Sequence, residues 1–351
     1  MRKSIQIISV FALISLQTIQ SQEIYRYGTT AANFLEIGIG SAGSAMGEAY
    51  VGVAQDLSSI YWNPAGLAYI KGSEAQFMMQ PWIVDINTIF AGAAVNVPRI
   101  GTFAFGLTQI GYGDMKVTTL SHQNGTGENF TANELAASLS YARKLAEWFA
   151  FGATTKLIHS SIWHTSANAF AVDLGVSVQT GFFSLSDRQE DGLTIAMSIA
   201  NYGTRMRYDG IDLLNPIDIS EYENGNYGDV PGQFRTQEWE LPLIFRIGGA
   251  LKPISTRNHT LILAADALHP NNNTESVNIG AEYSINIPGT ARVFVRSGYK
   301  GLYMDSSEYG MTGGAGVELF FMRNQSIAVD YAYKTMGLLG NVSAYTISMS
   351  F

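Results

Sequence analysis

Residues 276–285 read SVNIGAEYSI, and they alternate between apolar side chains and side chains that are small or polar. Val277, Ile279 and Tyr283 belong to the apolar set, whereas Asn278 and Glu282 belong to the polar set. Successive side chains of a β-strand point to opposite faces, so this order gives one apolar face and one polar face. A strand with lipid on one side and a water-filled lumen on the other needs one apolar face and one polar face. The stretch therefore indicates a transmembrane β-strand.

Segments of this kind recur from residue 72 to the last residue. Residues 168–179 alternate in the same way around Asp173, and residues 327–334 do so around Asp330. Single-chain bacterial barrels have an even number of strands. The sequence predicts an all-β transmembrane fold, a 14-stranded antiparallel outer-membrane β-barrel over residues 72–351. Its strands are expected near residues 72–80, 87–97, 101–110, 133–143, 148–159, 168–183, 191–203, 241–252, 259–268, 275–286, 290–300, 310–321, 325–336 and 343–351.

The connections between these segments indicate how the barrel is oriented. Alternate connections are short, such as residues 98–100 and the predicted turn SLSDRQE at residues 184–190. The two long connections, residues 111–132 and 204–240, both fall on the opposite side. Barrels of this class have short periplasmic turns and longer external loops, so we expect both long segments outside the cell.

The composition narrows the class of protein. Only 14% of the 351 residues are charged, against about 25% in an average soluble protein. The formal net charge of -8 argues against a nucleic-acid partner, because phosphate binding needs a basic surface. The lack of cysteine excludes disulfides, thiolate catalysis and Cys-ligated metal.

The N-terminus predicts export. Arg2 and Lys3 precede an apolar run over residues 5–16, which is too short to span a membrane as a helix. Residues 1–21 are therefore expected to form a secretory signal peptide. No later apolar run reaches about 18 residues, which leaves a closed barrel as the way to cross lipid. We expect the protein in the outer membrane of a bacterial cell.

A soluble β-sandwich is the alternative fold, since its strands alternate as well. Charged residues opposite the apolar face are compatible with both folds, but fourteen strands would make an unusually large sandwich. In the barrel, polar residues on this face would line the lumen and pair with one another or with plug backbone. The residues expected there are Lys156, Asp173, Arg246, Asp266, Glu282, Arg292, Arg296, Glu318 and Asp330.

Residues 38–43, GIGSAG, match the glycine spacing of a dinucleotide-binding turn. Such a turn belongs to a βαβ unit and is trailed by an acidic residue about twenty positions on. No βαβ unit follows here, and Asp56 comes too early. Small side chains explain the stretch better, because they let one backbone pass close to another, as in a segment threaded inside a barrel.

The runs SAMGEA at residues 44–49, VAQD at residues 53–56 and YWNPAGL at residues 61–67 resemble the N-terminal signature of the PorV/PorQ family. These are outer-membrane barrels with the architecture of the fatty-acid transporter FadL. The resemblance implies that residues 22–71 fold inward as a plug or hatch. Ala42 departs from the pattern, since relatives often carry arginine there. The plug-motif residues that the resemblance selects are Gly43, Met46, Gly47, Asp56, Asn63, Pro64, Ala65 and Gly66.

The run NPAG at residues 63–66 predicts a compact corner. A residue before proline avoids the α conformation, so Asn63 should be extended, with a side chain that can bond nearby backbone. Gly66 would admit a left-handed turn. The corner is expected either to join the plug to the first strand or to contact a ligand.

The last predicted strand ends on Phe351, in the same outward phase as Tyr345. A chain that stops on an aromatic residue in this phase resembles bacterial outer-membrane barrels, whose last strand carries an assembly signal. The resemblance assigns that role to Tyr345 and Phe351.

No motif in the sequence indicates catalysis, a cofactor or a metal site. The chain lacks HExxH and nucleophile-elbow motifs. The histidines lie in predicted loops or near strand ends, at His122, His159, His164, His259 and His269.

Two functions remain compatible with the sequence. The resemblance to PorV implies an accessory of type IX protein secretion that binds cargo C-terminal domains or a translocon subunit. The resemblance to FadL implies instead a channel for uptake of a hydrophobic small molecule. The acidic and aromatic segment 204–240 would then be either a partner-binding surface or a solvated lid. An accessory should have a sealed lumen, and a channel an apolar groove at its external mouth.

Overall fold

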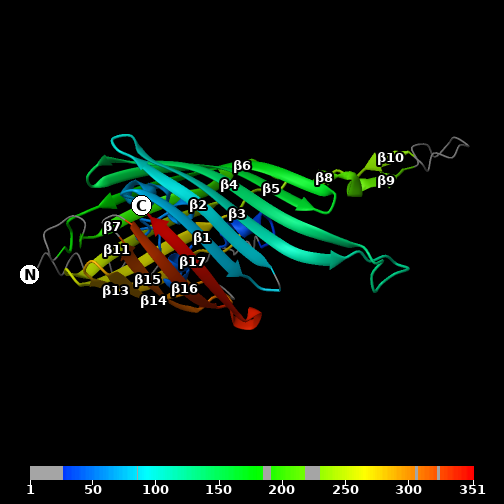
Figure 1. Cartoon of the computed structure of the whole chain (residues 1–351). Helices are drawn as coiled ribbons and strands as arrows, with labels where there is room; N and C mark the ends of the chain where they lie inside the picture. The colour runs from blue at the N-terminus through cyan, green and yellow to red at the C-terminus, as the bar shows by residue number, and fades with distance from the viewer. Residues whose placement is uncertain (1–26, 85, 185–190, 218–229, 305–306, 322–324) are drawn as a thin grey trace, which may run out of the picture.

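The structure is a computed structural model that describes residues 27–84, 86–184, 191–217, 230–304, 307–321 and 325–351. Within these ranges, fourteen long antiparallel strands form one closed ring (Figure 1). The ring closes where β1 (Ser73–Pro81) pairs with β17 (Asn341–Ser350). The prediction of a 14-stranded outer-membrane barrel is confirmed. The expected signal peptide, residues 1–21, lies outside the described residues.

The other strands of the ring follow one another in chain order, with β7 next to β11. They are β2 (Asn87–Val97), β3 (Gly101–Lys116), β4 (Asn129–Ala146), β5 (Phe149–Ile162), β6 (Thr165–Gln179), β7 (Thr194–Gly203), β11 (Ile244–Ser255), β12 (His259–Pro270), β13 (Ser276–Ile287), β14 (Ala291–Leu302), β15 (Met311–Phe321) and β16 (Gln325–Thr335).

Strand boundaries differ clearly from the sequence prediction at two places in the ring. β3 and β4 run beyond residues 110 and 133, because their pairing resumes after a bulge and continues to Lys116↔Asn129. β6 ends before the predicted residue 183, so its connection to β7 covers residues 180–193 and is longer than expected. Neither difference changes the strand count or the direction of the strands.

The side chains predicted to face outward and those predicted to face the lumen do so in the strands of the ring. Tyr283 and Tyr331 point outward and are 36% and 39% exposed. Their neighbour Glu282 is buried, and the Asp330 side chain is only 12% exposed. The apolar face is therefore the outer, lipid-facing face, and the polar face lines the interior. This result excludes the two-layer sandwich.

A small arm extends from the ring between β7 and β11. It contains β8 (Asp209–Gly210), η4 (Ile211–Leu213), β9 (Leu214–Pro216) and β10 (Pro231–Gln233). β8 pairs with β6, while β9 and β10 pair only with each other. In Figure 1, β9 and β10 project away from the end of the barrel and do not cover its mouth as a lid. The β3–β4 connection and η5 (Gly337–Leu339) lie at the same end.

The segment before β1 lies inside the ring. It forms four short helical turns, η1 (Asn33–Glu36), α2 (Ser41–Ala45), α3 (Ser59–Trp62) and η2 (Pro64–Tyr69). α2 contacts β14 to β17, and η2 contacts β3 to β6 on the other side of the ring. No helix of the described residues is long and apolar enough to cross a membrane.

Candidate functional site

The inner segment, here called the plug, touches the wall through backbone at Gly47. Gly47 has φ +66°, and a Cβ there would lie 2.6 Å from the Tyr299 nitrogen and 2.7 Å from the Ile279 oxygen. The wall also has glycines at this contact. A Cβ at Gly298 would lie 2.3 Å from the Gly47 nitrogen. Met46, whose side chain is fully buried, meets Gly280 in the same way. The small residues thus serve close backbone approach.

Gly43 has a different neighbour, the indole of Trp62. A Cβ at Gly43 would lie 2.8 Å from the Trp62 Cε2 and Nε1 atoms. Trp62 is 1% exposed, and its Nε1 donates a hydrogen bond to the Ile39 oxygen at 2.8 Å. The plug therefore packs two of its own segments tightly around one ring.

The NPAG corner is bonded to both the plug and the wall. Asn63 is extended, with φ −161° and ψ 105°, as expected before proline. Its Oδ1 accepts from the Ala65 nitrogen, and its Nδ2 donates to the Val51 oxygen at 3.2 Å and to the Val176 oxygen of β6 at 3.0 Å. The corner is thus a plug-to-wall tie placed before β1.

Gly66 does not adopt the left-handed turn expected from the sequence. It lies within η2 and has no positive φ. A Cβ at Gly66 would instead lie 2.2 Å from the Ala54 oxygen and 2.5 Å from the Ser59 hydroxyl. Glycine is required there because the plug folds back on itself. Pro64 and Ala65, the other residues of the corner, are buried against β5.

Asp56 organises the turn between these two parts of the plug. Its Oδ1 accepts from the Ser58 nitrogen at 2.9 Å and from the Ser58 hydroxyl at 2.5 Å, and its Oδ2 accepts from the Tyr50 hydroxyl. Burial raises the pKa of Asp56, although the bonds from Ser58 oppose that shift. Asp56 is a structural carboxyl of the plug.

Several of the predicted lumen residues form buried ion pairs across strands. Lys156 of β5 contacts Asp173 of β6 at 2.6 Å and the Asn201 side chain at 2.7 Å. Arg296 of β14 contacts Glu282 at 2.6 Å and Asp330 at 2.5 Å, and so joins three strands. These side chains cluster on the lumen face of the strands.

Two further lumen residues contact the plug. Asp266 of β12 accepts from the Val51 nitrogen at 2.8 Å. The Arg246 guanidinium of β11 lies 5.0 Å from the centre of the Tyr61 ring, with Nη2 3.4 Å from the Tyr61 hydroxyl. Both side chains are buried and fix the plug to β11 and β12, which lie two and three strands from β6 in the ring.

Arg292 and Glu318 lie at the rim and not deep in the lumen. Their closest charged atoms are 3.6 Å apart, and the Arg292 side chain is 42% exposed. Glu318 also accepts a hydrogen bond from the Ser326 hydroxyl at 2.8 Å. The inward phase of these residues is as predicted, but solvent reaches them.

A cluster that the sequence analysis did not single out centres on Glu48. Glu48 lies next to Gly47 in the plug, and its carboxylate contacts Lys300 of β14 at 2.8 Å and Lys334 of β16 at 3.6 Å. Burial alone would raise the pKa of Glu48, but the two lysines hold it below its usual value. Lys300 shares the inward phase of Arg296, so strand phase was the available signal for the wall side of this cluster.

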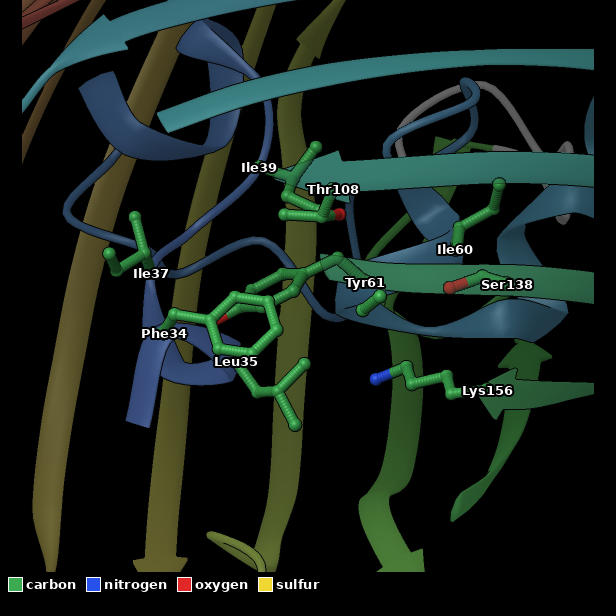
Figure 2. A pocket seen from close by; sticks show the side chains of 10 residues that line it. Phe34, Leu35, Ile37, Ile39, Ile60, Tyr61, Thr108, Ser138 and Lys156 are labelled. Carbon is green, nitrogen blue, oxygen red and sulfur yellow. The ribbon is translucent and has the colours of Figure 1, made fainter. Parts of the chain in front are cut away.

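Two small cavities lie between the plug and the wall. Figure 2 shows one cavity, bounded by Phe34, Leu35 and Tyr61 of the plug, with Lys156 reaching toward it from the wall. Its volume is about 20 Å³, and a second cavity beside Glu48 measures about 10 Å³. A site of this size holds about one water molecule. The plug therefore fills the lumen around these cavities.

The end of the chain forms part of the barrel seam. The Phe351 nitrogen donates to the Ser73 oxygen at 2.9 Å, and the Ser73 nitrogen donates to the Phe351 oxygen at 2.7 Å. Tyr345 and Phe351 both face outward and are 52% exposed. An assembly role of these two residues stays a prediction. In the described part of the chain, no group of three His, Cys, Asp or Glu side chains could hold a metal ion.

These features define a class: a closed outer-membrane β-barrel whose lumen is filled by its own N-terminal segment. Solved structures with this fold include the toluene transporter TodX of Pseudomonas putida, with a TM-score of 0.55, 11% identity, and coverage of 89% of this chain and 97% of that one. The toluene transporter TbuX of Ralstonia pickettii matches with a TM-score of 0.53 and 10% identity, and a Pseudomonas aeruginosa FadL homologue matches with a TM-score of 0.50 and 12% identity. Each of these two alignments covers 89% of this chain and 97% of the other chain. At these identities the likeness concerns the fold.

The family is defined by the sequence itself. Residues 20–220 match the family model for the type IX secretion system protein PorV, and the chain belongs to that family. The match covers the plug and the strands from β1 to β7. A search of curated proteins finds no match. The protein is therefore an outer-membrane barrel of the PorV family, as its N-terminal runs indicated.

Proposed function

We propose that this protein is a non-enzymatic accessory of type IX secretion whose external surface binds secreted cargo or a translocon subunit. The observation that carries the proposal is the filled lumen. Glu48, Asn63 and Asp266 tie the plug to β14, β6 and β12, on different sides of the ring. A protein whose interior is occupied in this way acts through its surfaces, and family membership gives the process those surfaces serve.

The external arm is the surface that best fits a partner. It extends beyond the membrane-spanning ring, and it exposes aromatic side chains such as Phe234 and Trp239. Exposed aromatic residues contribute a large share of the energy at protein interfaces. Cargo C-terminal domains and a translocon subunit are the partners we propose for it.

A pull-down from detergent-solubilised outer membranes tests this function. The tagged protein should recover secretion components, and replacing residues 214–233 by a short Gly-Ser turn should abolish that recovery. The matched control replaces residues 117–128, the other long external loop, by the same turn and should keep recovery. Recovery of lipid or aromatic hydrocarbon with no protein partner would overturn the proposal.

A hydrophobic uptake channel is the second candidate, and one feature favours it. Phe245, Ile247 and Val277 line an apolar groove of about 260 Å³ on the outer wall, next to the external β12–β13 connection. The pairing of β13 with β14 shifts register between Val277 and Ile279 beside this groove. Mass spectrometry of hydrophobic molecules that copurify with the wild type and with Val277→Trp distinguishes the two functions. Only a channel would lose a bound molecule on this substitution.

A further inference from the structure

Arg143 of β4 lies on the lipid-facing side of the barrel wall. It is exposed, and its position in the strand has the outward phase of Leu139, which is 60% exposed. In β4, in β5 and in β3 up to Gly111, Arg143 is the one Lys, Arg, Asp or Glu with this phase. An arginine on the lipid face of a barrel is costly at mid-membrane and tolerated near the interfaces. The place of Arg143 along the strand therefore decides what its charge can contact.

Arg143 stands near the periplasmic end of the wall. β4 ends at Ala146, and a short turn joins it to β5. This end is opposite to the external arm (Figure 1), and the short turns of such barrels lie in the periplasm. A long side chain at this level can lay its stem along the apolar wall and keep its charge among the headgroups of the inner leaflet.

Aromatic side chains surround Arg143 on the same face. Phe151 of β5 is directly opposite Arg143 in the strand register. On the other side, the Tyr141 ring packs against Phe103 of β3, with the ring centres 5.1 Å apart, and Phe103 is 45% exposed. A Cβ at Gly101 would lie 2.9 Å from the Tyr141 ring, so this ring covers a position that has no side chain. The wall beside Arg143 is thus a surface of rings that faces lipid.

A second arginine stands at the same rim. The Tyr141 hydroxyl donates to the Ile100 oxygen at 2.7 Å, so the β2–β3 turn is bonded to β4. Arg99 lies in this turn, is exposed and has φ +70°. Glycine and asparagine adopt the left-handed region with less strain, so the shape of the turn does not explain an arginine there.

The two arginines lie within reach of one ligand. The pairing of Thr102 with Ala142 brings residue 101 of β3 beside Arg143, and Arg99 is two positions before residue 101. Two residues of chain span about 7 Å at most, which two arginine side chains bridge easily when they bind the same group.

The charge of this rim is positive. Residues 97–101 and 143–149, which include the two turns, contain Arg99, Arg143 and Lys144 and one acidic residue, Glu147. Lys144 faces the lumen side, where its Nζ lies 4.4 Å from the centre of the Tyr69 ring. Pairing of Glu147 with either arginine would still leave the other arginine for an anionic ligand.

We propose that Arg143 and Arg99 bind the phosphate group of an anionic phospholipid of the inner leaflet, whose acyl chains pack on Phe103, Tyr141 and Phe151. Guanidinium groups form short charge-assisted hydrogen bonds with phosphate oxygens. The exposed rings gain apolar contact from the acyl chains. The site lies at the end of the barrel opposite to the external arm, so this inference does not depend on the proposed function.

A phospholipid fits these groups better than a free phosphate ion does. Free phosphate would contact only the guanidinium groups, and salt screens such contacts at an exposed rim. A lipid phosphate is held at this level by its own acyl chains, which raises its effective concentration beside the arginines. The rings next to Arg143 likewise gain contact only from a ligand with an apolar part.

Native mass spectrometry of the full-length protein in detergent tests the inference. The probe is dioleoylphosphatidylglycerol, and the matched control lipid is dioleoylglycerol, which keeps both acyl chains and lacks the phosphate group. We expect the wild type to bind the phospholipid about tenfold more tightly than dioleoylglycerol, because hydrogen bonds to charged groups are stronger than neutral ones. Arg143→Gln should abolish this preference, and Arg99→Gln should reduce it by a smaller factor.

The matched control variant is Arg292→Gln. Arg292 is an arginine at the same end of the barrel, but it has the inward phase and lies 3.6 Å from Glu318. This variant should bind both lipids as the wild type does. Arg143→Lys should retain most of the preference because it keeps the charge. Heat-dependent migration in denaturing gels checks that each variant is folded.

Three results would overturn the inference. The first is equal binding of the two lipids by the wild type, and the second is an unchanged preference in Arg143→Gln. The third is displacement of the phospholipid by millimolar inorganic phosphate, which would assign the two arginines to a free anion instead.

Discussion

The plug and the external arm are built from the same chain but are held in opposite ways. The plug is buried, with backbone packed on wall glycines at Gly47 and with charged side chains that contact each other within 3 Å, as at Glu48 and Lys300. The arm has short strands, and its ion pair Arg205–Glu240 joins side chains that are 59% and 58% exposed. The contrast teaches that stability resides in the filled lumen, whereas the arm is free to serve recognition.

The largest loss of stability is expected from substitution of Arg296 in the filled lumen. Arg296→Met leaves Glu282 and Asp330 buried without a partner, which should lower the free energy of unfolding by about 3–5 kcal/mol. Arg292→Met, on the same strand but at the rim, should lower it by less than about 1 kcal/mol. Urea unfolding of the refolded barrel in lipid vesicles measures both. Equal losses would show that the two arginines are not in different environments.

The next effect is expected at the plug-to-wall contact. Gly47→Ala adds a methyl group against the backbone of β13 and β14 and keeps φ at +66°, so it should cost about 2–5 kcal/mol from strain and overpacking together. Gly289→Ala has a similar φ of +74° and no atom within 4 Å, so it should cost only the backbone strain of about 1–2 kcal/mol. The difference between the two free energies of unfolding gives the cost of the close backbone contact at Gly47. Equal losses in the two variants would show that this contact does not constrain residue 47.

A smaller loss in the free energy of unfolding is expected from substitution at the NPAG corner. Asn63→Ala removes the bonds to Ala65, Val51 and Val176 and leaves buried backbone groups unpaired, which should cost about 1–3 kcal/mol. Asn124→Ala, at an exposed position of an external loop, should change stability by less than about 0.5 kcal/mol. Limited proteolysis of the two variants would also report whether the plug has loosened.

The smallest effect on stability is expected in the arm. Replacing residues 214–233 by a Gly-Ser turn should leave the unfolding energy within about 0.5 kcal/mol of the wild type, because β9 and β10 pair only with each other. The same variant should lose its secretion partners. A large loss of stability would mean that the arm supports the barrel and would remove the contrast between the two regions.

The strands and their faces were predictable because their signal is local. Asp173 and Glu282 lie inward because each sits in a segment of period two, and that period needs no knowledge of the rest of the chain. The plug was inferred from a resemblance, and small residues at 38–47 made it plausible. What these residues touch was not predictable, since Gly298 and Gly280 are more than two hundred positions away.

The sequence missed features that depend on the meeting of distant segments. Glycine is required at residue 66 because Ala54 and Ser59 pack against it and leave no room for a Cβ. Its φ is not the reason. Glu48 becomes an ion-pair centre only because β14 and β16 bring Lys300 and Lys334 to it. The extension of β3 and β4 depends in the same way on pairing between strands.

By itself, the sequence determined the barrel, its strand number, its lipid-facing surface and its family, because alternation along a strand and short contiguous runs are encoded locally. Only the tertiary structure decided that the plug fills the lumen, that Glu48 and Arg296 are centres of buried ion pairs, and that β9 and β10 of the arm pair only with each other. The physical reason is that packing density and charge pairing depend on distances between residues remote in the chain, which closure of the ring sets.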